Sequence, residues 1–460
     1  MTTPQHLVEH ALEISTADHC VVIVRESSTA NLRWANNTLT TNGLMSASSV
    51  TVVSLVDGSA GSAVGVLTRS ATTAGQVEAL VAEADEVARA AGPAEDAAPL
   101  VEGSESADWG SLPGRTSLEV LQRFGSSLGQ AFDRSRSGGR LLFGYVEHDV
   151  TTTYLGASTG LRLRHEQPTG HVGVTGKPTD WSASAWVGQA VEQLSDIDVD
   201  GLDTELVRRL RWAERTVDLP AGRYETLLPP TAVADLAIYA YWVGSGRDAH
   251  DGQTVYSDPS GGTKVGQQIA RSGVRLSSDP AAPGLAALPF ALATASSSAE
   301  SVFDNGLPLG ATDWIRDGKL NALLTSRHAG RLTNLSTTPA IDNLSLSVDG
   351  GAGSVDDLIA SSEQTLLLTC LWYFREVDPQ TLLLTGITRD GVYLVEGGEV
   401  VGAVNNFRFN ESPIDLLNRF TEAGQTQRSF SREWGDYFPR TATPTLRIPD
   451  FNMSSVSQAS

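Results

Sequence analysis

The sequence contains few cysteines, few lysines and no long apolar run. Only two of its 460 residues are cysteines, Cys20 and Cys370, and each stands inside an apolar run. Two such cysteines do not make a disulfide framework, so we expect a reducing compartment such as the cytoplasm. No apolar stretch reaches the ~20 residues that a membrane-spanning helix needs. The first residues also lack the basic region and apolar core of a signal peptide. We therefore predict a cytoplasmic protein without a membrane partner.

Positive charge is also scarce. The chain carries 33 Lys and Arg residues against 54 Asp and Glu residues, which gives a formal net charge of −21. The phosphate backbone of a nucleic acid is itself negative and would be repelled by such a surface. We therefore expect no nucleic-acid partner.

Length and element pattern predict an α+β protein of three domains. At about 150 residues per domain, a chain of this length allows about two to four domains. We expect an N-terminal domain at residues 1–110, a middle domain at 111–220 and a C-terminal domain at 221–460. The first shows an α/β layered pattern that ends in an acidic linker at 92–114. Its predicted elements are helices at 4–14 and 72–91 and strands at 20–25, 31–36, 49–56 and 62–67.

The middle domain reads as an antiparallel meander flanked by helices at 117–135 and 202–217. Glycines at 156, 160 and 170 are predicted turns between its strands. The predicted strands are 141–146, 151–155, 161–165, 171–175 and 182–186. From residue 221 onward short strands dominate, and we predict a β-rich C-terminal domain with a barrel-like mixed sheet.

A predicted helix that begins near Thr231 organises the C-terminal domain. It follows an extended run, 222–230 (GRYETLLPP), whose last proline suits the first turn of a helix. Gly244 and Gly246 are predicted to end it. Its apolar residues recur at helical spacing: Ala232, Val233, Leu236, Ala237, Tyr239 and Ala240.

Four further segments follow this helix in the sequence and contribute to a resemblance. They are 339–346 (PAIDNLSL), 385–391 (TGITRDG), 395–404 (VEGGEVVGAV) and 443–451 (TPTLRIPDF). Taken together with the strand and helix around residue 230, this layout resembles the TldD/TldE (PmbA) family, whose members are regarded as peptidase subunits. The resemblance spans most of the chain and is densest from Gly222 to Val456.

The resemblance also implies which branch of the family this chain joins. In the TldD branch the helix carries His-Glu-x-x-x-His, whose two imidazoles share a face and hold a zinc ion. The third ligand there is a cysteine shortly before the closing strand. Here the only histidine between Thr231 and Gly252 is His250, and residues 431–438 (SREWGDYF) contain no cysteine. The resemblance is therefore to the TldE branch, which implies no catalytic residue, metal ligand or cofactor in this chain.

Three weaker candidates have ordinary explanations beside the chemical ones. His250 and Asp251 could form a general base, but a solvated loop after the helix is favoured. His6, Glu9 and His10 match the inverted zincin pattern H-x-x-E-H, and we interpret this short match as coincidence. Cys370 could replace the missing ligand, although a small buried hydrophobe is the favoured interpretation.

These observations predict a non-metal-binding subunit of a heteromeric TldD/TldE zinc peptidase. The resemblance implies that a TldD-like partner holds the zinc and cleaves small proteins or peptides, while this chain supplies scaffold and substrate chamber. One alternative is a stand-alone hydrolase that uses His250 and Asp251. Another is a homodimeric protein that binds peptides without cleaving them. The sequence leaves open whether the isolated chain is a monomer or a homodimer.

Overall fold

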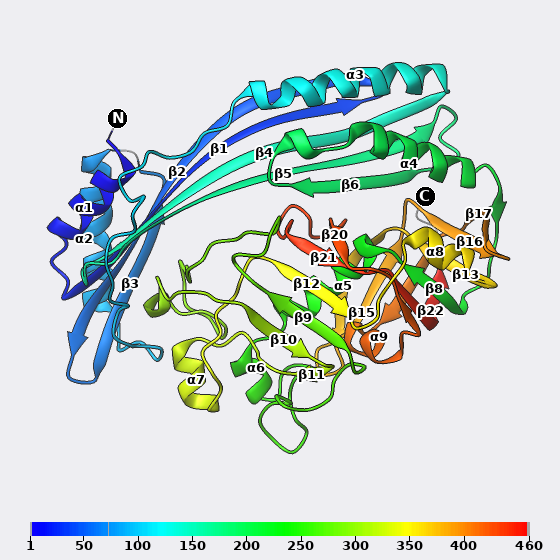
Figure 1. Ribbon diagram of the computed structural model, residues 1–460. Coiled ribbons are helices and arrows are strands. Elements are labelled where there is room, and N and C mark those ends of the chain that lie inside the picture. Colours follow the sequence, from blue (N-terminus) through cyan, green and yellow to red (C-terminus); the bar gives the residue numbers. More distant parts are fainter. Residues whose placement is uncertain (1, 72, 458–460) are drawn as a thin grey trace.

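A curved antiparallel sheet of six strands forms the N-terminal part of the protein. The computed structural model describes residues 2–71 and 73–457 (Figure 1). The strand order is β3-β2-β1-β4-β5-β6, and every neighbouring pair is antiparallel. The strands are β1 (His19–Ala35), β2 (Thr38–Gly58), β3 (Gly61–Arg69), β4 (Arg140–Ala157), β5 (Arg162–Pro178) and β6 (Ala185–Val191).

These strands are longer than the sequence predicted. The predicted strands 20–25 and 31–36 are two ends of β1, because β2 and β4 pair with its polar centre as well. The turn that follows is confirmed, with Asn36 and Asn37 at φ 51° and 57°, as a type I′ hairpin requires. Gly156 and Gly170, predicted as turns, lie inside β4 and β5 instead. The five strands predicted for the meander therefore correspond to only three observed strands, β4, β5 and β6.

The sheet also crosses the predicted domain boundary at residue 110. Strand β1 belongs to the predicted N-terminal domain and β4 to the predicted middle domain, yet they pair from Val21↔Ala157 to Trp34↔Gly144. The predicted linker, residues 92–114, lies within a segment, 91–117, that contains no helix or paired strand beyond isolated bridges. In this structure the linker connects two halves of one sheet.

Four helices cover the convex face of this sheet (Figure 1). Helices α1 (Pro4–Ile14) and α2 (Ala74–Ala90) pack at one end, where Val22, Val24 and Tyr154 supply the apolar surface. Helices α3 (Gln122–Ser137) and α4 (Val199–Trp212) pack at the other end. Thr3 and Thr73 cap the first pair by accepting backbone N–H groups; the predicted start of the second helix, Thr72, lies outside the described residues. Two short 3-10 helices accompany them, η1 (Leu118–Leu121) and η2 (Leu194–Asp196).

The C-terminal domain lies beneath the concave face and contains two open sheets. One has the order β11-β10-β9-β12-β21-β20, and the other the order β14-β15-β18-β22-β8-β13-β16-β17-β7 with β19 beside β22. The second sheet is mixed, since β8 runs parallel to β13 and antiparallel to β22. The α+β class is confirmed, and within the described residues neither sheet closes into a barrel.

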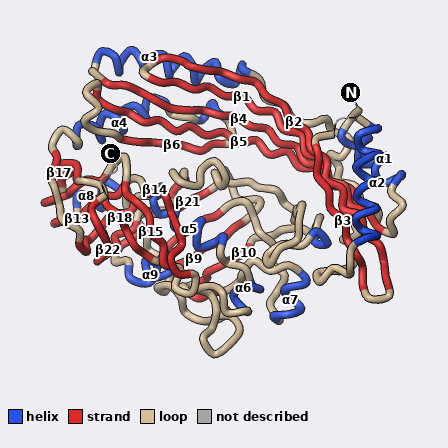
Figure 2. Tube along the Cα trace, turned by 180° about the vertical axis from the view of Figure 1, so that it is seen from behind, coloured by secondary structure: helices blue, strands red, loops and turns tan. Residues whose placement is uncertain are grey.

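The elements of this domain are short. Its helices are α5 (Pro230–Trp242), α6 (Gly246–His250), η3 (Val302–Asp304), α7 (Arg327–Thr333), α8 (Val355–Ala360) and α9 (Pro413–Arg419). Its strands are β7 (Thr216–Val217), β8 (Gly222–Leu228), β9 (Val274–Ser278), β10 (Thr312–Arg316), β11 (Lys319–Leu320), β12 (Leu344–Val348), β13 (Gln364–Leu368), β14 (Leu371–Asp378), β15 (Leu383–Thr388), β16 (Val392–Glu396), β17 (Glu399–Val404), β18 (Phe407–Glu411), β19 (Glu422–Ala423), β20 (Gln427–Ser429), β21 (Thr441–Thr443) and β22 (Leu446–Val456). Figure 2 shows that loops make up much of the domain between α5 and the α1–α2 end of the first sheet.

Helix α5 lies in the core of this domain. Its apolar residues share one cluster with Leu276 and Leu346 of the first C-terminal sheet and with Leu446 of the second. A helix that is apolar on nearly all sides is normally buried in this way. Its one carboxylate, Asp235, is 0% exposed, so this side chain is the exception that the core must accommodate.

Candidate functional site

Helix α5, where the resemblance to the TldD branch places the metal ligands, contacts the segment 431–438. Ser431 Oγ donates to Asp235 Oδ1, and Glu433 N donates to the same oxygen at 3.0 Å. Trp434 Nε1 donates to the backbone oxygen of Asp235 at 3.1 Å. The two segments that the sequence comparison singled out, far apart in the chain, therefore meet here in space.

Burial changes the chemistry of Asp235. Desolvation raises the pKa of its carboxyl to about 8, against the opposing hydrogen bonds from Ser431 and Glu433. Near neutral pH the group is therefore mostly protonated, which avoids a buried negative charge. Its second oxygen, Oδ2, is buried without a hydrogen-bond partner among the described residues.

The residues around Asp235 do not fit a zinc ion. A catalytic zinc site takes three protein ligands from His, Cys, Asp or Glu, and α5 contains no His, Cys or Glu. The hydrogen-bonded oxygen of Asp235 is already committed to Ser431 and Glu433. Across residues 2–71 and 73–457, no three such side chains form a group that could hold a metal ion.

Cys370 belongs to a different cluster of side chains from the contact between α5 and residues 431–438. It is buried in a cluster with Trp186, Ala190 and Phe430, where the first sheet meets the C-terminal domain. Burial raises the pKa of its thiol to about 12, so the thiolate that binds metals or attacks substrates is disfavoured.

The weaker candidates lie elsewhere and are not brought together. His250 and Asp251 are exposed at the end of α6, a short helix where the sequence suggested a loop. Asp251 Oδ2 accepts from Arg247 Nε at 2.7 Å. At the N-terminus His6 and His10 stack with ring centroids 6.1 Å apart, but Glu9 pairs with Arg162 at 2.6 Å.

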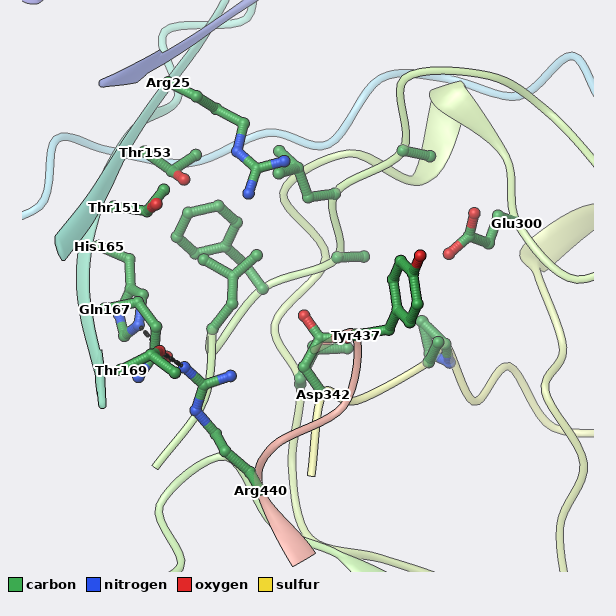
Figure 3. Close-up of a pocket in the computed structure, with 18 of the residues that line it drawn as sticks. Arg25, Thr151, Thr153, His165, Gln167, Thr169, Glu300, Asp342, Tyr437 and Arg440 are labelled. Atoms are coloured by element: carbon green, nitrogen blue, oxygen red, sulfur yellow. Dashed lines mark hydrogen bonds between the residues drawn. The ribbon is translucent and has the colours of Figure 1, made fainter. Parts of the chain in front are cut away.

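A cleft lies between the concave face of the first sheet and the C-terminal domain (Figure 3). Its volume of about 430 Å³ falls within the range of about 300–1,000 Å³ that is usual for ligand pockets. Strands β4 and β5 form one wall, and loops at 288–309, 339–342 and 435–440 form the other.

A two-residue alternation builds the sheet wall of this cleft. Alternate residues of a strand point to the same face, and those that line the cleft are polar. The four cross-strand pairs are Glu147↔His171, Asp149↔Thr169, Thr151↔Gln167 and Thr153↔His165. The sequence analysis treated these residues only as parts of a meander. The alternation itself was visible in the sequence, but the covering loops that make it a cleft were not.

Most acidic groups of the cleft already have partners. Asp149 accepts from Thr29 and from Thr151, both at 2.7 Å. Asp304 pairs with Arg327 at 2.6 Å. Glu147 accepts from the hydroxyl of Tyr145, and burial is the main cause that raises the pKa of that hydroxyl above its usual range.

The histidines of the cleft are neutral bases at physiological pH. Desolvation lowers the pKa of both His165 and His171. His165 Nε2 shares a hydrogen bond with Gln167 Oε1 at 3.1 Å. His171 Nε2 stands 3.5 Å from Asp436 Oδ1. The cleft is thus a polar surface rather than a site with an obvious nucleophile.

Comparison with known proteins agrees with this architecture. A family model of the PmbA/TldA metallopeptidase C-terminal domain matches residues 221–455, just over half of the chain. The chain belongs to the TldD/TldE (PmbA) family of peptidases. The matched part is nearly coextensive with the predicted C-terminal domain. No curated protein sequence matches the chain significantly.

Solved structures extend the likeness to the whole fold. TldE from Thermococcus kodakarensis has a TM-score of 0.78 at 15% identity, with 97% of this chain and 99% of that chain covered. A Bacteroides thetaiotaomicron protein proposed to be a modulator of DNA gyrase has a TM-score of 0.76 at 14% identity, with coverage of 99% and 100%. A Thermotoga maritima protein with the same proposed role has a TM-score of 0.74 at 15% identity, with coverage of 94% and 95%. No helix in the described ranges has both the length and the apolar character to cross a membrane.

Proposed function

We propose that this chain is the TldE-like subunit of a heteromeric peptidase and that a TldD-like partner carries the zinc. One observation carries the proposal. The helix that would present the metal ligands, α5, instead presents Asp235, whose carboxyl is buried against Ser431 and Glu433. Zinc-assisted hydrolysis needs an open coordination position for water, so we assign bond cleavage to the partner.

The edge of the first sheet supports a role in an assembly. Strand β3 pairs with β2 only from Val50 onward, so residues 38–49 of β2 pair on one side only. Leu39, Leu44 and Met45 are exposed there, at 53%, 53% and 54%. No charged residue or proline occurs from Trp34 to Val56. Proteins usually protect free edges with charges or prolines, which makes this edge a suitable surface for another subunit.

The proposed role of the chain is to shape the substrate chamber. Small proteins or peptides would reach the partner's zinc past surfaces that this chain provides, such as the cleft beneath the first sheet. An extended peptide can add to a strand edge through backbone hydrogen bonds. We propose the cytoplasm as the place where this happens, in keeping with the two unpaired, buried cysteines.

Reconstitution with a partner tests the proposal. The chain is purified alone, then mixed with a TldD-like subunit whose helix carries His-Glu-x-x-x-His, and cleavage of an unfolded peptide is followed by mass spectrometry. We expect cleavage by the mixture only, and its loss when the partner's glutamate is changed to glutamine. Cleavage by this chain alone, or about one tightly bound zinc per chain by elemental analysis, would overturn the proposal.

The polar cleft favours one alternative, a homodimeric protein that binds peptides without cleaving them. In that case the free edge of β2 would pair with its own copy. Analytical ultracentrifugation separates the two functions, because a stable homodimer that excludes the TldD-like subunit supports the alternative. Formation of a one-to-one complex supports the peptidase subunit.

A further inference from the structure

Two arginines in the cleft have no carboxylate partner. Arg440 lies partly buried in the wall of the cleft, and its guanidinium donates to Thr169 Oγ1. Arg25 projects from β1 toward the same space (Figure 3). Within the described chain, neither arginine stands within ion-pair distance of an Asp or Glu, although most arginines of this protein do (Arg134, Arg164, Arg208, Arg327 and Arg447 are examples).

Two carboxylates in loops of the C-terminal domain, the wall to which Arg440 also belongs, form no ion pair. Glu300 and Asp342 line the cleft from two loops of the C-terminal domain (Figure 3). Among the described contacts, neither side chain accepts a hydrogen bond or joins an ion pair. Desolvation, with a further contribution from Asp342, raises the pKa of the Glu300 carboxyl above its usual range. Asp342 also counteracts the lowering of the pKa of Arg440, so it lies within electrostatic range of both Glu300 and Arg440.

Of these four groups only Arg440 is partly buried, whereas Arg25, Glu300 and Asp342 are exposed. A partly desolvated charge without a partner is unfavourable, and burial lowers the pKa of Arg440 for this reason. Other acids of the same cleft, Asp149 and Asp304, have close partners inside the chain. The charges without an ion pair thus occupy particular positions. Arg25 and the guanidinium of Arg440 lie beside the sheet, and Glu300 and Asp342 lie on loops of the C-terminal domain.

An arginine fork is suited to one kind of ligand group. Guanidinium binds carboxylate with two parallel hydrogen bonds, and Thr169 holds Arg440 in place for that contact. A pair of carboxylates suits a primary ammonium, which donates three hydrogen bonds. Tyr437, 79% exposed and drawn between Asp342 and Glu300 in Figure 3, adds an aromatic face for the chain of the ligand.

We propose that the cleft binds a short peptide by its two charged ends, with the C-terminal carboxylate on Arg440 and a primary ammonium at Glu300 and Asp342. The inference rests on the proposed function for the peptide nature of the ligand. It adds a substrate class, namely peptides with a free C-terminus, which are also what a peptidase leaves behind. The ammonium can be the N-terminus or a lysine side chain, and the experiment separates these sources.

Isothermal titration of the isolated full chain tests the carboxylate end. The probes are tetra-alanine and its C-terminal amide. We expect amidation to weaken binding to the unchanged protein by at least about tenfold, since it removes a charge-assisted bidentate contact. In Arg440→Gln both probes should bind equally weakly. The matched control is Arg123→Gln, because Arg123 is an exposed arginine on α3, on the other face of the sheet.

The ammonium end is tested with N-acetyl tetra-alanine and with acetyl-Lys-Ala-Ala-Ala. If the N-terminus is the bound group, acetylation weakens binding and the lysine peptide does not restore it. If a lysine side chain is the bound group, the lysine peptide binds more tightly than both tetra-alanine and N-acetyl tetra-alanine. The double variant Glu300→Gln/Asp342→Asn should abolish these differences, whereas Glu399→Gln, an exposed acid at the β16–β17 turn, should retain them.

Several outcomes would overturn the inference. The inference is wrong if the unchanged protein binds tetra-alanine and its C-terminal amide with equal affinity. It is also wrong if neither peptide binds measurably. A carboxylate preference that persists in Arg440→Gln would also overturn the inference. Thermal unfolding checks that each variant folds, and Arg440→Lys, which keeps the charge but loses the fork, serves if the glutamine variant does not.

The same titration keeps this inference separate from the proposed function, because it contains no partner. Peptide binding by this chain, combined with no cleavage after a TldD-like subunit is added, would leave the cleft assignment intact and overturn the subunit role. Cleavage by the mixture, combined with no dependence of binding on the peptide ends, would support the subunit role and overturn the cleft assignment.

Discussion

The surroundings of Asp235 and the cleft beneath the first sheet treat polar groups in opposite ways. At Asp235 one carboxyl oxygen is bonded inside the chain and burial raises the pKa to about 8. In the cleft, Arg440, Glu300 and Asp342 form no close ion pair with any described side chain. The first arrangement satisfies the carboxyl oxygen inside the fold, whereas the second leaves charged groups open to a ligand. Chemistry in this chain is therefore to be sought in the cleft and not at the family's metal position.

Removing the carboxyl of Asp235 should have the largest effect on stability. In Asp235→Ala, the Ser431 hydroxyl and the Glu433 amide lose their acceptor and a cavity remains. We expect the free energy of unfolding at pH 5 to fall by about 2–4 kcal/mol, measured by urea denaturation. Asp235→Asn retains an acceptor oxygen and should stay within about 1 kcal/mol. Equal losses in both variants would mean that the hydrogen bonds contribute nothing.

The pH dependence of stability should differ between the wild type and Asp235→Asn. An aspartate in the unfolded chain ionises near pH 3.9, but burial raises the pKa of folded Asp235 to about 8. Between these values only the folded state holds the proton, so the contribution of Asp235 falls as pH rises and levels off above about pH 8. The free energy of unfolding of Asp235→Asn minus that of the wild type should therefore increase, by at most about 1.4 kcal/mol for each unit by which the pH rises. A constant difference from pH 5 to 8 would show that Asp235 ionises freely.

Neutralising Arg440 should affect stability far less and in the other direction. The cation is partly buried without a carboxylate, so Arg440→Gln is expected to leave the free energy of unfolding unchanged or raise it by up to about 1 kcal/mol. Urea denaturation at pH 7 measures this change. A loss of more than 1 kcal/mol would mean that Arg440 holds the two parts of the protein together and would contradict the comparison.

The smallest effect is expected at His250. Its side chain is exposed at the end of α6, and the neighbouring Asp251 pairs with Arg247 instead. His250→Ala should change the free energy of unfolding by less than about 0.5 kcal/mol and leave cleavage by the reconstituted mixture unchanged. A large loss of cleavage would revive the alternative that uses His250 and Asp251 as catalytic groups.

Local signals predicted the helices well and the strands only in part. Pro4 and the apolar spacing after it fixed the bounds of α1, and Pro230 with its helical spacing predicted α5. The polar centre of β1, from Ser27 to Thr29, gave no strand signal, because its extension comes from pairing with β2 and β4. Pairing between distant strands is a tertiary effect that a local pattern does not contain.

The two sites show the same limit more sharply. The absence of metal ligands on α5 could be read from the sequence, but the contact of Asp235 with Ser431 joins residues 196 positions apart. The alternation at Glu147, Asp149, Thr151 and Thr153 is what the solvated face of an antiparallel sheet also shows. Only the position of the covering loops turns that face into a cleft.

The unprotected edge of β2 has a consequence for how the protein is produced. Residues 38–49 carry no charge, so when this edge is uncovered two copies of the chain repel each other only through charges elsewhere in the protein, whose net charge is −21. At physiological ionic strength this repulsion fades over about 8 Å, which is less than the width of two added strands. Dissolved salt should therefore promote self-association of the chain when it is produced alone.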